Sequence, residues 1–341
     1  MDTRNTSINC HAEWHPLKEV VVGIADGARI PPHDRSLKAI NYANMDIPVP
    51  EGLYPEQVIE ETNEDLERFV SVLKSRDIVV HRPTAEYLTD DEYYVYCPRD
   101  SFITVGNSII ETPMPLRARY MENFAYHNIF LDKMKQGANW ISAPKGRLPD
   151  EAYQVNSIDK DTLTLKEIEP CFDAANVLKC GRDILYLVSN SGNLLGAQWL
   201  ENTLGSNYRV HRLENLYSYM HLDSTISLLR PGLVLVNPSR INKDNLPKIF
   251  KDWDVIYSAD NVDIGHYPGY CNASVWIGIN LLMLDEKTAV VEEHQTAVIK
   301  QLESKGIDVC ALPLRHSRTL GGGFHCITND LYRQGTLESY I

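Results

Sequence analysis

Apolar and polar positions recur in a regular pattern along this 341-residue chain. Short runs of β-branched and apolar residues flank turns of Gly, Asn, Pro or Asp, which is the pattern of β-hairpins. Hairpins are therefore expected over residues 101–113, 176–188, 224–237 and 274–292, and a further strand over residues 18–23. These segments divide the chain into five strand-rich parts.

Between them lie stretches with apolar residues every three or four positions, the spacing of an amphipathic helix. The strongest is Pro55–Ser75, and the others are Leu116–Met134, Gly196–Leu204 and Thr296–Lys305. Strand pairs that alternate with helices predict an α/β fold built from a repeated ββαβ-type unit. No linker-like tract separates the units, so we expect a single domain over residues 1–341.

Composition narrows the class of protein. The chain is 43% hydrophobic and 23% charged, with a net charge of −13, which argues against nucleic acid or an anionic membrane as a partner. No apolar run is long enough to span a membrane, and Met1–Asn5 lacks the core of a signal peptide. Seven cysteines without a metal-binding motif predict a reducing cytoplasm and neither metal nor cofactor.

The segment Leu320–Cys326 reads LGGGFHC. Three glycines allow close backbone approaches that other residues cannot make. Cys326 at the end of this run is therefore a candidate nucleophile, since a reactive thiolate needs open access to its substrate. The competing interpretation is an inert, packed cysteine.

Other chemistry-bearing residues precede apolar strands. His221 and Asp223, two positions apart, would share one face of an extended strand, although such a polar face is often only solvated. Asp173 and Asp100 each stand just before an apolar run, where a capping role is the alternative. The sequence thus places several acids at corresponding ends of the expected hairpins.

One thiol, one imidazole and several carboxylates suit a guanidinium substrate. Carboxylates accept the N–H groups of this planar cation in pairs. Breaking its C–N bond needs a strong nucleophile at the central carbon and an acid for the departing amine. A protease-like Cys-His pair would not need so many acids, so the pattern favours guanidine chemistry.

These residues resemble those of the arginine-dependent amidinotransferases, the glycine and inosamine-phosphate type within the guanidine-modifying pentein superfamily. The likeness runs from Glu13 to Tyr340. Its most specific segments are Cys97–Asp100, Ile110–Met114, Phe172–Ala175, His221–Asp223, Asn237–Arg240 and Leu320–Cys326. The resemblance implies a five-bladed, pseudo-symmetric α/β propeller with a central active site, which agrees with the repeat.

The resemblance also implies catalytic roles. Cys326 matches the nucleophile that forms a covalent amidino-cysteine as ornithine leaves. His221 matches the general acid that protonates ornithine and then the base that deprotonates the acceptor amine, and Asp173 matches the acid paired with it.

Four further positions match substrate-binding residues of the family. Asp100 and Asp223 match the carboxylates that hold the guanidinium, and Arg240 and Ser274 resemble residues that bind the α-carboxylate of the donor. The expected partners are therefore L-arginine and a small amine, while a homodimer is left open as the assembly.

The acceptor amine is less defined. Met220 resembles the glycine-using branch, where methionine narrows the acceptor site, although it could equally fill the core. A methionine at this position favours a glycine- or lysine-like amino acid as the acceptor, in bacterial secondary metabolism. Full-length similarity to inosamine-phosphate enzymes keeps an aminocyclitol phosphate as the alternative. A hydrolase of the arginine deiminase type, in which water resolves the intermediate, is the alternative of another class.

Some residues near these motifs are expected to be structural. His325 adjoins Cys326 and, in an extended segment, would point to the opposite face. Cys97, Cys171 and Cys271 are expected to be packed. Arg315–Arg318 is a basic patch that is either solvated or bound to an anionic group of a substrate.

Overall fold

The computed structural model describes residues 7–42, 50–155 and 162–341, so the Met1–Asn5 segment lies outside the described residues. The helices are α1 Arg35–Ile40, α2 Glu56–Lys74, α3 Pro98–Ser101, α4 His127–Lys135, α5 Leu194–Leu204, α6 Thr296–Ser304 and α7 Ser317–Leu320. The strands are β1 Leu17–Val22, β2 Arg29–Ile30, β3 Gly52–Leu53, β4 Val79–His81, β5 Phe102–Val105, β6 Ser108–Glu111, β7 Asn139–Ser142, β8 Val177–Cys180, β9 Asp183–Leu187, β10 Arg209–Leu213, β11 Ile226–Arg230, β12 Leu233–Val236, β13 Asp254–Tyr257, β14 Leu282–Asp285, β15 Thr288–Glu292, β16 Asp308–Leu312 and β17 Thr328–Arg333.

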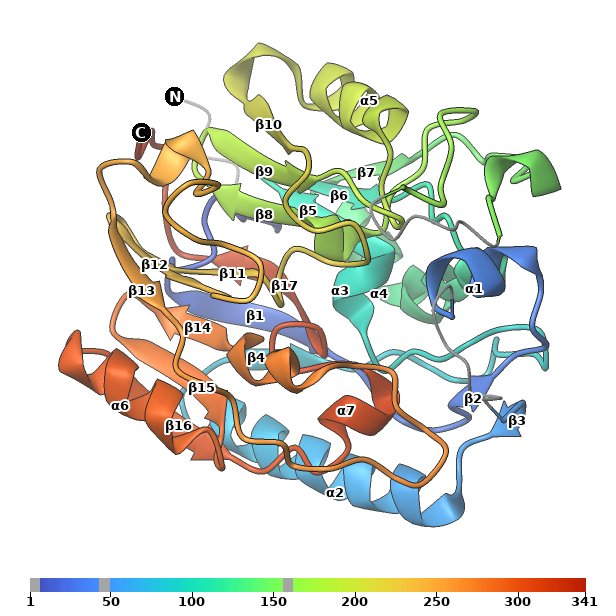
Figure 1. Cartoon of the computed structure of the whole chain (residues 1–341), viewed down its shortest axis with the longest axis horizontal. Helices are drawn as coiled ribbons and strands as arrows, with labels where there is room; N and C mark the ends of the chain where they lie inside the picture. The colour runs from blue at the N-terminus through green and yellow to red at the C-terminus, as the bar shows by residue number, and fades with distance from the viewer. Residues whose placement is uncertain (1–6, 43–49, 156–161) are drawn as a thin grey trace.

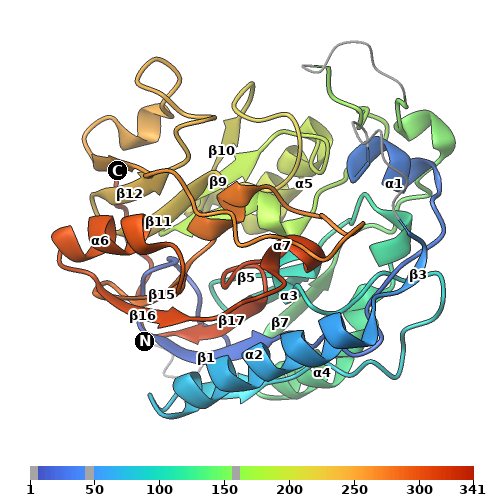
Figure 2. The ribbon, with the colours of Figure 1, turned by 60° about the horizontal axis from the view of Figure 1, so that its bottom comes forward.

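Within these residues, five sheets of three strands surround the middle of the molecule, and α2, α5 and α6 lie on its outside (Figures 1 and 2). Each sheet repeats one plan. An antiparallel pair such as β5 and β6 is followed by a helix, here α4, and a third strand, β7, that runs parallel to the second. This is the ββαβ-type unit that the sequence predicts.

The unit that holds the two ends of the chain together was not predicted. Strand β17, near the C-terminus, pairs antiparallel with β1, and β4 adds parallel to β1 after α2. The last and first segments therefore complete one blade between them. Pairing across the full length of the chain leaves no local signal in the sequence, because it depends on tertiary packing.

The strands of the antiparallel pairs are mostly buried on both faces, whereas third strands such as β10 and β16 are half-buried or exposed. All four residues of β12, for example, are buried. Helix α2 buries one apolar stripe that includes Leu66, Phe69 and Leu73 and exposes charged residues on its other side. The predicted hairpins over residues 101–113, 176–188 and 224–237 and the helices near residues 55–75, 196–204 and 296–305 are thus confirmed, with ends shifted by one or two residues. The hairpin expected over residues 274–292 forms only from β14 onward, at Leu282.

Three local predictions were wrong. Residues 116–134 do not form one helix: two 3-10 turns precede α4, because Arg119 and Glu122 turn inward to pair with each other. Residues 275–279 form a 3-10 turn instead of a strand. His221 lies in a turn with φ of +63°, before β11 begins, so it does not share a strand face with Asp223.

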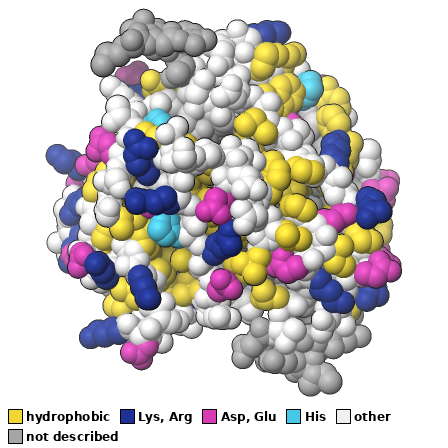
Figure 3. Space-filling model, turned by 90° about the horizontal axis from the view of Figure 1, so that it is seen from above, with side chains coloured by type: hydrophobic (Ala, Val, Ile, Leu, Met, Phe, Trp, Pro, Cys, Tyr) yellow, Lys and Arg dark blue, Asp and Glu magenta, His cyan; other side chains and the backbone are white. Residues whose placement is uncertain are grey.

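Nothing among the described helices is both long and apolar enough to cross a membrane. On the face seen in Figure 3, basic and acidic side chains are interspersed among the described residues.

Candidate active site

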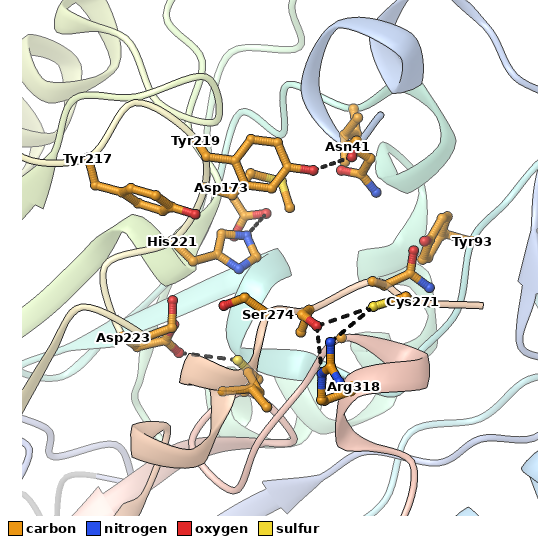
Figure 4. Close-up of a pocket in the computed structure, with 18 of the residues that line it drawn as sticks. Asn41, Tyr93, Asp173, Tyr217, Tyr219, His221, Asp223, Cys271, Ser274 and Arg318 are labelled. Atoms are coloured by element: carbon orange, nitrogen blue, oxygen red, sulfur yellow. Dashed lines mark hydrogen bonds and ion pairs between the residues drawn. The ribbon is translucent and has the colours of Figure 1, made fainter. Parts of the chain in front are cut away.

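A cavity of about 260 Å³ opens at the centre of the sheets, where the ends of several units meet. Figure 4 shows the side chains that point into it from different segments. Its wall includes Cys326, His221, Asp173, Asp223, Arg240, Ser274 and Met220, seven of the eight residues that the sequence singles out. The eighth, Asp100, lies directly behind, because side-chain atoms of Asp100, Asp173 and His221 lie within 4.8 Å of one another.

The thiol of Cys326 sits at the buried end of this cavity. Its Sγ lies 3.3 Å from Oδ2 of Asp223 (dashed line at Asp223 in Figure 4). The hydrogen bond with the thiol of Cys97, then burial and the charge of Asp223, raise the pKa of Cys326 well above its ordinary value. The thiol therefore stays protonated until a cation enters the site.

The glycine run is explained by close contacts. Gly321 ends α7 in a left-handed conformation with φ of +87°. A Cβ on Gly322 would lie 2.5 Å from Sγ of Cys97, and one on Gly323 would lie 2.7 Å from the backbone oxygen of Asn280. The glycines bring the backbone against neighbouring segments, and the same contacts place Cys326.

His221 and Asp173 form a close pair. Nε2 of His221 lies 2.9 Å from Oδ2 of Asp173, and the other ring nitrogen faces the cavity (Figure 4). Burial lowers the pKa of His221, but the charges of Asp173 and Asp100 outweigh it and raise the pKa to about 9. The backbone N–H of His221 donates to Oδ1 of Asn176, which holds the turn. His221 is therefore protonated at neutral pH.

Asp100 is fixed by a buried arginine. Nη1 of Arg119 donates to Oδ2 of Asp100 at 2.7 Å, while Arg119 also binds both oxygens of Glu122. Burial and the charge of Asp173 raise the pKa of Asp100 to about 6. Its Oδ1 is buried and has no hydrogen-bond partner. Oδ1 of Asp223 is likewise buried and has no hydrogen-bond partner.

Asp100, Asp173 and His221 are also the types of residue that ligate metal ions. Arg119, however, occupies Oδ2 of Asp100 and lies 3.8 Å from Asp173. Its guanidinium supplies positive charge where a metal ion would, so this donor set fits a substrate cation better than a resident metal.

Arg240 lies on the other side of the cavity. Nη1 donates to the Ser224 backbone oxygen and to Oγ1 of Thr225, and the guanidinium lies 3.6 Å from the centre of the Tyr217 ring. Burial lowers its pKa, and the acceptors of its Nη1 are a backbone oxygen and two hydroxyls, not a carboxylate. Ser274 is exposed, and Met220 lies at the cavity wall. A buried cation without an acid beside it is suited to an anionic substrate group.

Comparison with known proteins identifies the family. The chain is 48% identical over 346 residues to inosamine-phosphate amidinotransferase 1 of Streptomyces glaucescens, with 98% of this chain and 99% of that protein covered. The chain belongs to the arginine-dependent amidinotransferases. It is therefore a transferase. No family model matches it.

Relatives of this chain with lower identity are named for other acceptors. It is 36% identical to the mitochondrial glycine amidinotransferase of Gallus gallus, covering 96% of this chain and 83% of the relative. It is 34% identical to the L-arginine:L-lysine amidinotransferase of Pseudomonas savastanoi pv. phaseolicola, covering 97% and 96%. These identities are lower than that to the inosamine-phosphate enzyme, so the comparisons support the aminocyclitol alternative better than the amino-acid acceptor that Met220 favoured.

Solved structures agree with the fold. The inosamine-phosphate amidinotransferase of Streptomyces griseus superimposes on the present structure with a TM-score of 0.93 at 46% sequence identity. The match covers 98% of this chain and 99% of the other. The dimethylarginine dimethylaminohydrolase of Pseudomonas aeruginosa reaches 0.59 at 13% identity, covering 92% and 99%, and shares the fold alone. The expected five-bladed pentein propeller is thereby confirmed.

The structure also reveals residues that sequence reasoning missed. Arg119, which binds Asp100, lay in a predicted amphipathic helix and carried no motif. Asn280 accepts the backbone N–H groups of both His325 and Cys326 at its Oδ1, at 3.1 and 3.0 Å. These bonds form a turn, so the extended segment predicted there was wrong and His325 is not turned away from the site.

The two arginines of the basic patch at residues 315–318 have different surroundings. Arg315 pairs with Glu64 and Asp65 of α2. Arg318 instead lines the cavity, where Nη2 donates to Sγ of Cys271 and Nη1 pairs with the exposed Asp263 (Figure 4 shows Arg318 and Cys271). Arg318 thus supplies a second cation, separate from Arg240, at the rim of the site.

Proposed function

We propose that this amidinotransferase takes the amidino group of L-arginine, holds it on Cys326 as a covalent amidino-cysteine, and passes it to the primary amine of an aminocyclitol phosphate. L-Ornithine is the first product. We also place the reaction in the cytoplasm, where unpaired cysteines remain reduced.

One observation carries the donor half of the proposal. Oδ1 of Asp100 and Oδ1 of Asp223 are buried acceptors without partners, near the thiol of Cys326. A buried carboxylate oxygen without a partner is costly, and a guanidinium supplies the missing N–H donors. Arg240 and Ser274 at the cavity wall then bind the α-carboxylate of the same L-arginine.

The first half-reaction transfers the amidino group to the enzyme. The bound guanidinium favours the thiolate, and the thiol proton leaves to solvent, so Asp223, whose Oδ2 lies 3.3 Å from Sγ, stays ionised. Sγ of Cys326 attacks the central carbon, forming a C–S bond. The C–N bond to ornithine then breaks as His221, which Asp173 keeps protonated, gives its proton to the departing nitrogen.

The second half-reaction reverses these roles. Neutral His221 takes a proton from the incoming amine, whose nitrogen attacks the amidino carbon. The C–S bond breaks, and the sulfur of Cys326 leaves as a thiolate that takes up a proton from solvent. Protons and electron pairs therefore balance over the cycle without a cofactor.

The acceptor half rests on the higher identity to inosamine-phosphate enzymes. Arg318 supports it, because its acidic partner Asp263 is 58% exposed and an incoming phosphate can exchange with that carboxylate. Met220 at the cavity wall is then a residue against which the ring of the acceptor packs.

The test supplies L-arginine with inosamine phosphate, unphosphorylated inosamine, glycine, L-lysine or no acceptor, and identifies products by mass spectrometry. Multiple-turnover ornithine release should be fastest with the phosphorylated amine and slower without the phosphate. Faster turnover with glycine or lysine would overturn the acceptor assignment. Citrulline without an acceptor would replace transfer by hydrolysis.

The pH dependence of kcat/KM for L-arginine should be bell-shaped. Below about pH 6, Asp100 takes up a proton and loses its attraction for the guanidinium, so kcat/KM falls. Above about pH 9, His221 loses the proton that it must donate, so kcat/KM falls again. Steady-state kinetics in overlapping buffers measures both limbs, and a profile without the alkaline limb would remove His221 as the acid.

A further inference from the structure

His325 is held between two carboxylates beneath the active site. Its Nδ1 lies 2.8 Å from Oδ2 of Asp223, and its Nε2 lies 3.3 Å from Oε2 of Glu13. The three side chains are 8%, 2% and 6% exposed. A carboxylate oxygen accepts hydrogen bonds, so both ring nitrogens donate and the ring carries two protons, as an imidazolium.

Contacts around His325 fix this orientation. Its backbone N–H donates to Oδ1 of Asn280, and its backbone oxygen accepts from Nε of Arg99 at 3.2 Å. Glu13 is in turn 3.3 Å from Nζ of Lys179 and 3.9 Å from Arg99. Burial acts to raise the pKa of Glu13, but the charge of Lys179, with His325 and Arg99, holds it below the ordinary value, so Glu13 presents a carboxylate to the ring of His325.

The imidazolium decides how Asp223 meets the substrate. It binds Oδ2, the same oxygen that receives the thiol of Cys326, and leaves Oδ1 free. The charged groups facing Asp223 are His325 and, farther away, His221 and Arg240. Burial acts to raise the pKa of Asp223, but the hydrogen bond and charge of His325, then the charge of His221, hold it below the ordinary value.

Charge balance explains why a histidine is needed here and a neutral donor is insufficient. Each acid of the site has its own cation: Arg119 binds Asp100, His221 binds Asp173, and His325 binds Asp223. His221 must become neutral during the reaction, so it cannot balance Asp223 throughout. Of the two histidines that face Asp223, His325 is the one that takes no part in proton transfer.

We propose that His325, held charged by Glu13, is a positioning residue that keeps Asp223 ionised and directs its free oxygen to the guanidinium of the donor. This inference rests on the proposed function, in which Asp223 binds L-arginine. It assigns a role in donor recognition to a pair of residues on the far side of Asp223 from the substrate.

The test compares His325→Gln and Glu13→Gln with the wild-type enzyme, using initial rates of ornithine release across pH. Loss of an opposite charge at hydrogen-bond distance moves a carboxyl pKa by roughly 1–3. In His325→Gln we therefore expect the KM for L-arginine at neutral pH to rise about tenfold or more. The acidic limb of kcat/KM, which Asp100 sets in the wild type, should steepen and move to higher pH because Asp223 then titrates together with Asp100. Glu13→Gln should move both quantities in the same direction by less.

A matched control is His81→Gln. His81 pairs with Glu19 at 2.6 Å on the outer strand β4, away from the cavity, so its loss should leave KM and the acidic limb unchanged. An unchanged acidic limb in both His325→Gln and Glu13→Gln would overturn the inference, even if both variants melt at lower temperature. If His325→Gln fails to fold, the pH profile of kcat/KM for Glu13→Gln alone tests the inference. Wild-type protein that releases no ornithine would instead reject the proposed function.

Discussion

Replacing Cys326 by serine should abolish ornithine release from L-arginine, lowering kcat by about 10⁴-fold or more. The serine hydroxyl keeps the size and the contact with Asp223, but it is a far weaker nucleophile toward the guanidinium carbon. Stopped assays of ornithine formation measure the loss, and a melting curve close to that of the wild type shows that the fold is kept.

The matched control for this substitution is Cys97→Ser. Cys97 is buried and its thiol contacts that of Cys326, yet it lies behind the nucleophile and does not line the cavity. Cys97→Ser should keep most of the activity. If instead Cys97→Ser were inactive and Cys326→Ser active, the nucleophile would have been assigned to the wrong thiol.

Replacing Asp173 by asparagine should lower kcat by roughly 10³- to 10⁴-fold. The amide keeps the size of the side chain and can still accept the backbone N–H of Ala175, which Oδ1 of Asp173 caps at 3.0 Å. It removes the charge that holds the proton on His221. The alkaline limb of kcat/KM should therefore also move to lower pH, since the pKa of His221 falls.

Asp183→Asn provides the comparison. Asp183 is likewise a fully buried carboxylate 2.7 Å from a histidine, His211, but it lies at the start of β9, outside the cavity. Its loss should destabilise the fold without moving the pH profile. Equal losses of kcat in the two variants would mean that Asp173 supports only the fold.

Much of the fold was predictable because its information is local. Apolar runs around tight turns identified the four hairpins, and apolar spacing identified α2, α5 and α6. The pairing of β17 with β1 was not predictable in this way, because it joins opposite ends of the chain. The expectation of a single domain over residues 1–341 stays a prediction.

The candidate site was predictable mainly from the family motifs, and its geometry was not. The period of a strand assigned His221 and Asp223 to one face, but the backbone N–H of His221 donates to Oδ1 of Asn176 and holds His221 in a left-handed turn. The same reasoning turned His325 away from the site, whereas Asn280 curls that segment and places His325 against Asp223. Both errors come from contacts between distant segments, which local periodicity does not record.

The most direct test of the account is the mass of the protein after incubation with L-arginine and no acceptor, followed by peptide mapping under acid conditions. The account predicts one added amidino group per chain, located on the peptide that contains Cys326, with release of an equal amount of L-ornithine. The group should disappear when the acceptor amine is added. Ornithine release without any modified cysteine, or modification at Cys97 instead of Cys326, would contradict it.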